Sequence, residues 1–270
     1  MIYRQHSATS RGSVTRTICS AVIGSVLVAP TAAAQSSTPT SWQTRHQDAV
    51  WVGGTIDRPI TKKTALWFDG SWRRMAFGRE PQQLLLRPGV QYTVTNGVRI
   101  AAGYVYVATA PYGALPAANP TREHRSWQQL LLTHRAGRVA FTQRYRLEQR
   151  WLFPLVPGVA GSADREYGDA TYQNRLRYMG RAQTELSQVK VKGRPVLLYG
   201  WNELLMPLGG PTQTLTIGQN RASVGFGIPH SPKLRTEIGY MNLYNAFPSR
   251  RANEVNHTLW VSWHYTGAAK

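Results

Sequence analysis

Apolar and polar side chains alternate along residues 137–151, GRVAFTQRYRLEQRW. Phe141, Tyr145 and Leu147 share one parity, and Arg146 and other charged residues occupy the positions between them. Because successive side chains of a β-strand point to opposite faces, this pattern predicts a strand with one apolar and one charged face. The central question is which of the two faces points outward.

Nearly all of the chain after residue 48 consists of similar runs separated by turn signals. Asn96-Gly97 and Ala136-Gly137 are typical of tight β-hairpins. No segment of useful length shows the 3.6-residue period of a helix. The sequence therefore predicts an all-β fold, an antiparallel up-and-down transmembrane β-barrel of 10–12 strands. The expected strands are 49–57, 64–74, 83–95, 98–109, 123–135, 138–151, 171–182, 194–206, 213–227, 232–242 and 256–266.

The connections between these expected strands alternate in length. Short connections follow the odd-numbered strands and longer ones follow the even-numbered strands, as in outer-membrane barrels with short periplasmic turns and long outer loops. Eleven strands is an odd number, however, and it starts the first strand at the end with the long loops. A further strand around Trp42 would restore the even count usual in bacteria, and a misplaced strand boundary is the other explanation.

The N-terminus has the pattern of an exported protein. Three arginines and no acidic residues precede an apolar run at 18–29, which is too short to span a bilayer and is followed by small residues at Ala32 and Ala34. We therefore expect a signal peptide at 1–34, an N-terminal lead at 35–48 and a barrel domain at 49–270. The expected location is the bacterial outer membrane, with the periplasm as the alternative.

Composition narrows the partners that such a chain could have. The formal charge of +19 falls to +16 after loss of the predicted leader, which also removes Cys19, the only cysteine. A basic exported chain favours outer-membrane lipid, lipopolysaccharide and small anionic solutes as partners, and export disfavours nucleic acid. No metalloprotease, calcium-loop or nucleotide-binding motif occurs, so we expect neither a metal site nor a cofactor.

Two orientations of the two-faced strands are possible. In an outer-membrane barrel the apolar face meets lipid, whereas in a soluble periplasmic barrel Phe141, Tyr145 and Leu147 would line a pocket for an apolar ligand. Aromatic residues near strand ends, long strands, and opposite charges on one face, such as Arg146 and Glu148, favour the membrane orientation. We therefore expect the charged face to line the lumen.

The inward charges could form a structural salt-bridge network or a basic lumen that selects anions. Arginine suits the first role through bidentate pairing with carboxylates, and rings of charge set ion preference in pores. Long side chains could fill a barrel of this size, so the structural role is favoured. A weak selectivity for anions is the other role expected of the same residues. The candidate lumen residues are Arg87, Glu123, Arg125, Arg144, Arg146, Glu148, Arg150, Arg175, Arg177, Glu203, Arg221 and Glu237.

A catalytic function is the less favoured alternative. Outer-membrane phospholipase is a barrel of similar size that uses a His-x-Ser pair with an asparagine, and here His124 and Ser126 lie on one strand face, with Asn119 or Asn174 as possible orienting groups. The residues flanking the pair do not resemble that enzyme. We therefore expect no enzymatic activity and no catalytic residues, with an outer-membrane lipid-modifying hydrolase as the alternative.

Several short motifs, in order, resemble the uncharacterised secreted proteins of domain-of-unknown-function family 2490. The resemblance covers most of the chain after the predicted leader, and it implies an outer-membrane-like barrel and no assigned activity. The motifs are Trp42, GYVY at 103–106, EHRSWQQ at 123–129, RYRLEQR at 144–150, NRLRY at 174–178, Asn202-Glu203, QNR at 219–221, EIGY at 237–240 and His257.

Overall fold

A computed structural model describes residues 41–158, 165–209 and 216–267. The expected signal peptide at 1–34 lies outside these residues. No helix in the described ranges is long and apolar enough to cross a membrane. The elements are β1 (Gln43–Pro59), β2 (Thr64–Met75), η1 (Ala76–Gly78), β3 (Glu80–Thr95), β4 (Val98–Thr109), β5 (Thr121–Ala136), β6 (Val139–Pro157), β7 (Arg165–Tyr167), β8 (Thr171–Val191), β9 (Arg194–Leu208), β10 (Gln219–Pro229), β11 (Leu234–Phe247), η2 (Pro248–Arg250) and β12 (Ala252–Thr266).

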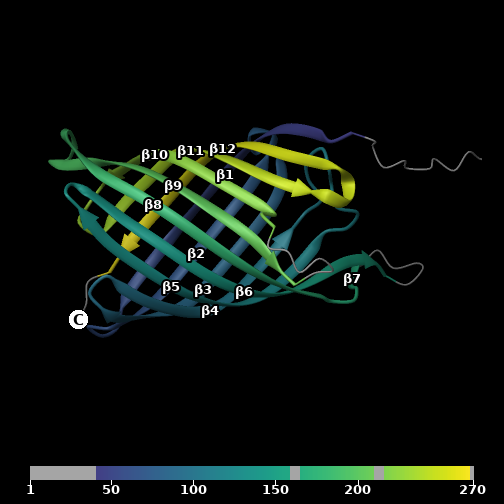
Figure 1. The fold of residues 1–270 in the computed structure, drawn as a ribbon, viewed down its shortest axis with the longest axis horizontal. Coiled ribbons are helices and arrows are strands. Elements are labelled where there is room, and N and C mark those ends of the chain that lie inside the picture. Colours follow the sequence, from purple (N-terminus) through teal and green to yellow (C-terminus); the bar gives the residue numbers. More distant parts are fainter. Residues whose placement is uncertain (1–40, 159–164, 210–215, 268–270) are drawn as a thin grey trace, which may run out of the picture. The chain divides into compact units, whose positions relative to one another are not determined.

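Of the twelve described strands, all except β7 form one closed barrel (Figure 1). Each strand pairs antiparallel with the next barrel strand along the chain, and β1 pairs with β12 to close the ring. The short β7 pairs only with the end of β6 among the described strands. The all-β, up-and-down fold of 10–12 strands predicted from the sequence is confirmed, and eleven strands is the observed number.

The closing pair of strands is parallel, as its register of Trp51 opposite Trp260 shows. In an up-and-down barrel neighbouring strands alternate in direction, so an odd number of strands makes the first and last run the same way. Within the described residues, no extra strand restores even parity, because Ser41 and Trp42 lie outside any strand. Instead the first strand begins at Gln43 rather than at 49, where it pairs with Ala252 of β12.

The two ends of the barrel differ in their connections. The connections after β1, β3, β5, β8 and β10 are tight turns, and this end is called the turn end. The connections after β2, β4, β6, β9 and β11 lie at the opposite end, called the loop end, and include η1, β7 and η2. In Figure 1 β12 ends toward the left, at the turn end, and β7 lies at the right, at the loop end. The longest connections, after β4, β6 and β9, lie at the loop end as the sequence predicts, but those after β2 and β11 are as short as the turns after β1 and β10.

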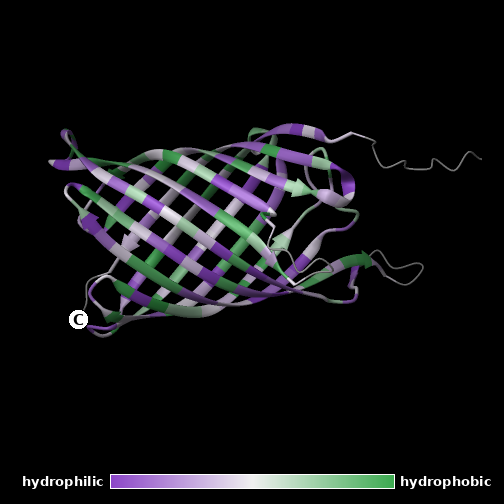
Figure 2. Cartoon of the chain, viewed as in Figure 1, coloured by the Kyte–Doolittle hydropathy of each residue, from purple (hydrophilic) through white to green (hydrophobic). Residues whose placement is uncertain are grey.

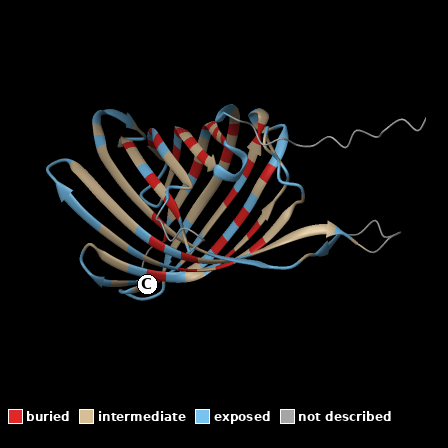
Figure 3. Ribbon diagram, turned by 45° about the vertical axis from the view of Figure 1, so that its right-hand side comes forward, coloured by how far each residue is buried: buried red, intermediate tan, exposed pale blue. Residues whose placement is uncertain are grey.

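The charged face of the strands points into the barrel and the apolar face points outward. On β6, Arg146 is 1% exposed, whereas the next residue, Leu147, is 37% exposed. Figure 2 shows the resulting alternation of hydrophilic and hydrophobic residues along every long strand, and Figure 3 shows buried residues distributed along the strands. The alternative in which Tyr145 and Leu147 line an inner pocket is wrong in orientation, because both lie on the outer surface.

Two large aromatic side chains in the interior lie against glycines. Trp127 is fully buried beside Gly89 and Gly103, and a Cβ atom on Gly89 would lie 2.5 Å from the Trp127 ring. Tyr199 lies against Gly225 and Gly239 in the same way on the other side of the barrel, where an added Cβ would approach its hydroxyl to 2.6 Å. The glycines thus leave the space that these rings occupy.

Gly103→Ala is expected to destabilise the barrel by about 1–3 kcal/mol, because the added Cβ overpacks against the β3 backbone at Pro88 and Gly89 as well as against Trp127. Its added Cβ would lie 2.9 Å from the Trp127 ring. Urea-induced unfolding in detergent measures the effect. Gly180→Ala is the control, since the nearest atom to its added Cβ is 3.7 Å away. Equal midpoints for the two variants would contradict the packing argument.

Candidate functional site

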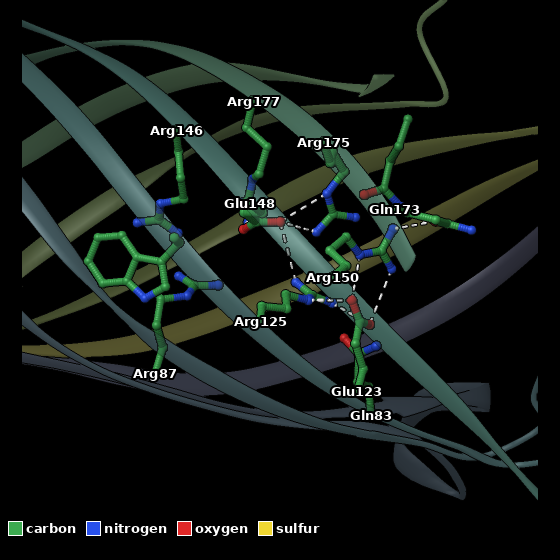
Figure 4. A network of polar contacts seen from close by, with 12 residues as sticks. Gln83, Arg87, Glu123, Arg125, Arg146, Glu148, Arg150, Gln173, Arg175 and Arg177 are labelled. Atoms are coloured by element: carbon green, nitrogen blue, oxygen red, sulfur yellow. Dashed lines mark hydrogen bonds and ion pairs between the residues drawn. The ribbon is translucent and has the colours of Figure 1, made fainter. Parts of the chain in front are cut away.

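The most distinctive feature of the interior is a network of arginines and glutamates that spans β5, β6, β8 and β9 (Figure 4). Strand alternation supplies its members, since consecutive inward positions of β6 carry Arg144, Arg146, Glu148 and Arg150. The register then aligns them with inward residues of the neighbouring strands. Glu148 is paired with Arg175 of β8, and Arg150 is paired with a further arginine of β5.

Glu148 is the central carboxylate of this network. It is 0% exposed. It accepts hydrogen bonds from Arg175 Nε at 3.0 Å and Arg177 Nη1 at 2.8 Å, and Arg125 Nη1 lies 3.6 Å away. Three guanidinium groups therefore surround one carboxylate that has no contact with solvent. Such a group is stable only while its partners remain charged and in place.

Glu203 and Glu123 are two further carboxylates held by several arginines each. Arg177 Nη2 donates to Glu203 Oε1 at 2.7 Å and Oε2 at 2.9 Å, while Arg144 Nη2 donates at 2.6 Å. Glu123 accepts a bidentate pair of bonds from Arg125, at 2.6 and 2.8 Å, and further bonds from Arg150. Arg177 thereby links Glu203 to Glu148, and the network is continuous across four strands.

A separate group of charges lies nearer the turn end. Glu237 accepts two hydrogen bonds from Arg181, at 2.8 and 3.0 Å, and one from Arg235 at 3.1 Å. His264 Nε2 lies 3.3 Å from the same carboxylate. On the β2–β3 side, Arg87 donates to Asp69 at 2.8 Å. Ion pairs therefore line the lumen along most of its length.

Some buried arginines have no carboxylate within 4 Å among the described residues. Arg146 donates instead to Gln129 at 2.6 and 3.0 Å, and its guanidinium lies 4.8 Å from the centre of the Trp127 ring. Arg73 donates to Gln83 and lies 3.8 Å above Trp51. Stacking on an indole ring and bonding to neutral amides partly replaces the missing anions.

Two cavities occupy the lumen between these side chains. The loop-end chamber has a volume of about 100 Å³, and the turn-end chamber about 190 Å³. The loop-end chamber is lined by Tyr112 from the β4–β5 connection and by Gln82 at the start of β3, and the turn-end chamber by Thr55 and His264. Trp51, Arg73, Arg177 and Arg221 line both cavities.

The β4–β5 connection, residues 110–120, reaches across the loop end of the barrel. Ala114 N donates to Gln47 of β1 at 3.1 Å, and Arg250 of η2 donates to the Leu115 carbonyl at 2.8 Å. Tyr112 packs against the buried cluster that contains Trp51. Burial raises the pKa of the Tyr112 phenol, which favours its neutral form. The connection therefore covers the loop-end chamber and is called the cap.

All twelve candidate lumen residues from the sequence lie on the inner face, and each contacts at least one other charged or amide side chain. The list omitted Asp69, Arg73 and Arg181, which contribute equally to the interior. The signal for Asp69 and Arg73 was present, because both share the parity of the buried Ser71 on β2.

His124 and Ser126, the candidate catalytic pair, lie on the outer face of β5. Ser126 Oγ donates to Gln149 at 2.7 Å, and His124 Nδ1 is hydrogen-bonded to the Tyr104 hydroxyl. No hydrogen bond joins these two described side chains to each other, and Asn174 is bonded to a tyrosine on its own strand. The structure thus brings the pair to one surface without the contact that activates a serine.

The described residues contain no group of three or more His, Cys, Asp and Glu side chains that could hold a metal ion. The lumen carboxylates described above are each paired with arginines, whereas the buried Glu254 accepts hydrogen bonds from Asn245 at 3.2 Å and Asn256 at 2.5 Å. The chemistry available in the interior is therefore that of guanidinium groups.

Comparison with known proteins gives a family but no activity. The model of a family described as "Protein of unknown function (DUF2490)" matches residues 48–254. An uncharacterized protein of Methylorubrum extorquens is 29% identical over 181 residues, which cover 66% of this chain and 69% of that protein. No solved structure matches the chain.

Proposed function

We propose that this chain, which belongs to the DUF2490 family of proteins of unknown function, is a bacterial outer-membrane barrel that admits only small anions to its arginine-lined lumen. The observation that carries the proposal is the distribution of side chains, with charges buried inside and apolar groups exposed outside. That is the reverse of a water-soluble barrel and the arrangement that a lipid bilayer requires.

The exposed apolar residues are spread over most of the eleven barrel strands and do not form a single patch. Soluble monomers rarely expose contiguous apolar surface of more than a few hundred Å². Here the outer face of every barrel strand except β8 and β9 carries at least one large hydrophobic group in its middle part. Examples, one from each of several strands, are Phe68, Leu86, Ile100, Leu130, Leu147, Phe226, Ile238 and Leu259. Lipid on all sides explains this distribution.

The turn end offers a complementary contact with lipid headgroups. Lys62 and Lys63 lie in or beside the β1–β2 turn, and Lys190 and Lys192 lie at the β8–β9 turn. Cations at the edge of an apolar band are placed to meet phosphates. Outer-membrane lipid and lipopolysaccharide are therefore the proposed surroundings of the protein.

The size and charge of the interior favour slow passage of small anions over free diffusion through an open pore. The two chambers are small, the cap covers one of them, and arginines outnumber carboxylates in their walls. A positive lumen raises the local concentration of anions and repels cations. The salt-bridge network thus has a structural role, and its surplus positive charge sets the ion preference.

Reconstituted protein in a planar lipid bilayer is expected to give small currents that prefer chloride to potassium in a salt gradient. Arg250→Ala, which removes the donor to the Leu115 and Pro116 carbonyls of the cap, is expected to increase the current. Single-channel recording measures both the conductance and the reversal potential. Cation preference, or no current from either protein when both run as folded barrels, would contradict the transport part of the proposal.

A lipid-modifying hydrolase is the second candidate function, because His124 and Ser126 face outward, where a lipid ester could reach them. We propose that this activity is absent, since Ser126 is bonded to Gln149 and not to the histidine. Release of fatty acid from phospholipid vesicles by the wild-type protein, abolished in Ser126→Ala, would establish the hydrolase instead.

A further inference from the structure

We propose that the loop-end chamber is a binding site for one small free oxyanion, such as phosphate or sulfate, held by Arg73, Arg175 and Arg221. This inference rests on the proposed function and deepens it by naming the class of anion that the lumen takes. Three independent features carry it: the charge of the chamber wall, the free donors of these arginines, and the way their positions are fixed.

The wall of the loop-end chamber is lined by six arginines and by no carboxylate among the described residues. Glu123, Glu148 and Glu203 bind several of these arginines from behind. Even so, nine arginines line the two chambers, against three carboxylates in the walls and three behind them, Glu123, Glu148 and Glu254, the last bonded to Asn245 of the loop-end wall. Buried charge without a counter-charge costs several kcal/mol per ion in ordinary proteins, so a bound anion would stabilise this wall.

Three guanidinium groups in this wall retain donor capacity. Arg175 uses Nε and Nη2 for Glu148, and Arg73 uses Nε and Nη1 for Ser71 and Gln83. Arg221 uses Nε and Nη2 for Gln219, and its Nη1 lies at a long 3.5 Å from Glu203. The remaining NH₂ groups, Nη2 of Arg73 and Nη1 of Arg175, make no hydrogen bond to another described residue.

Neighbouring side chains hold these arginines in place before any anion arrives. Trp51 contacts both Arg73 and Arg221, whose guanidinium carbons lie 3.8 and 5.2 Å from the centre of its ring. The Trp51 indole nitrogen in turn donates to Gln82 at 2.8 Å. A site whose donors are fixed in advance loses little entropy when it binds a ligand, which favours specific binding over a diffuse positive charge.

The size and shape of the chamber favour a small oxyanion over larger or simpler anions. A volume of about 100 Å³ has room for a small oxyanion but not for a lipid. The planar fork of a guanidinium matches two oxygen atoms of phosphate, sulfate or carboxylate, whereas a spherical chloride ion offers no pair of acceptor atoms spaced to fit the two donors of the fork. The amide side chains of Gln82, Gln83 and Gln219 add neutral polar groups to the wall.

Calorimetric titration of the full-length folded protein in detergent with inorganic phosphate, at constant ionic strength in chloride, tests the proposal. We expect saturable binding to one site per chain and competition by sulfate. The double variant Arg73→Gln/Arg221→Gln should weaken phosphate binding by about tenfold to a hundredfold, since hydrogen bonds to charged groups have this magnitude.

Arg99→Gln is the matched control, because Arg99 lies at the turn end beside Asp57, outside both chambers, and its loss should leave phosphate binding unchanged. A heat-dependent mobility shift on a detergent gel shows that each variant is folded. No saturable binding to the folded wild-type protein, or equal affinity of wild type and double variant, would overturn the site. Anion-selective currents without phosphate binding would overturn this inference alone, and phosphate binding without any current would overturn only the transport function.

Discussion

Replacing Phe226 with arginine is expected to destabilise the barrel, lowering its free energy of unfolding in phospholipid vesicles by about 2–4 kcal/mol. Phe226 is 51% exposed on the outer face of β10, where it is the eighth of eleven residues. It lies opposite Ile238 of β11 and Leu198 of β9. If this surface faces lipid, an arginine there must leave water to enter the hydrocarbon. If it faced water, the same change at an exposed position would have an effect within about 0.5 kcal/mol.

Urea-induced unfolding in vesicles, followed by tryptophan fluorescence, measures this difference. Phe77→Arg is the matched control, since Phe77 is even more exposed but lies in η1 at the loop end, beyond the apolar band. We expect Phe77→Arg to leave both insertion and stability nearly unchanged. Equal stability of the two variants, or better solubility of Phe226→Arg in the absence of detergent, would show that the outer face of β10 does not meet lipid.

Glu148→Gln is expected to lower the stability of the barrel by about 3–5 kcal/mol, because it removes one partner from a buried ion network. Arg125, Arg175 and Arg177 would then lose the carboxylate they share. Glutamine keeps the shape of the side chain, so no cavity forms, and the loss is one of charge. The three guanidinium groups would remain close together in the interior with fewer anions to separate them.

The unfolding midpoint in urea, compared at high and low phosphate, measures this second effect. Glu166→Gln on the exposed β7 is the control and should be neutral, because exposed charges contribute little. A Glu148→Gln protein as stable as the wild type would mean that the network does not hold the strands of the barrel together. Partial rescue by phosphate is the result expected if an added anion can replace the missing carboxylate.

The sequence was sufficient to predict the strands and their two faces, because both follow from local alternation. Residues 139–151 show this most clearly, and β6 has the expected charged inner positions. The parallel seam between β1 and β12 was not predictable from local pattern. It depends on the pairing of Gln43 with Ala252, residues at opposite ends of the barrel sequence, and no turn between them fixes the register.

The contacts within the arginine and glutamate network were likewise not predictable from local pattern. Alternation identified the inward charges, but not which arginine bonds which carboxylate. Arg144 reaches Glu203 across 59 residues of sequence, and Arg181 reaches Glu237 across 56. The chambers and the cap were also not predictable from the sequence, because they depend on how the β4–β5 connection folds back to contact Gln47 of β1. Local periodicity carries no information about contacts between strands so far apart in the chain.

The most direct test of the central claim, that the apolar face of the barrel lies in an outer membrane, is to express the full-length chain and fractionate the cell envelope. The fractions are then run, unheated and heated, on a detergent gel. We predict that the protein is in the outer-membrane fraction, needs detergent for extraction, and migrates differently before and after heating, as a folded membrane barrel does. A protein that is soluble in the periplasm and shows no change in mobility on heating would contradict the account.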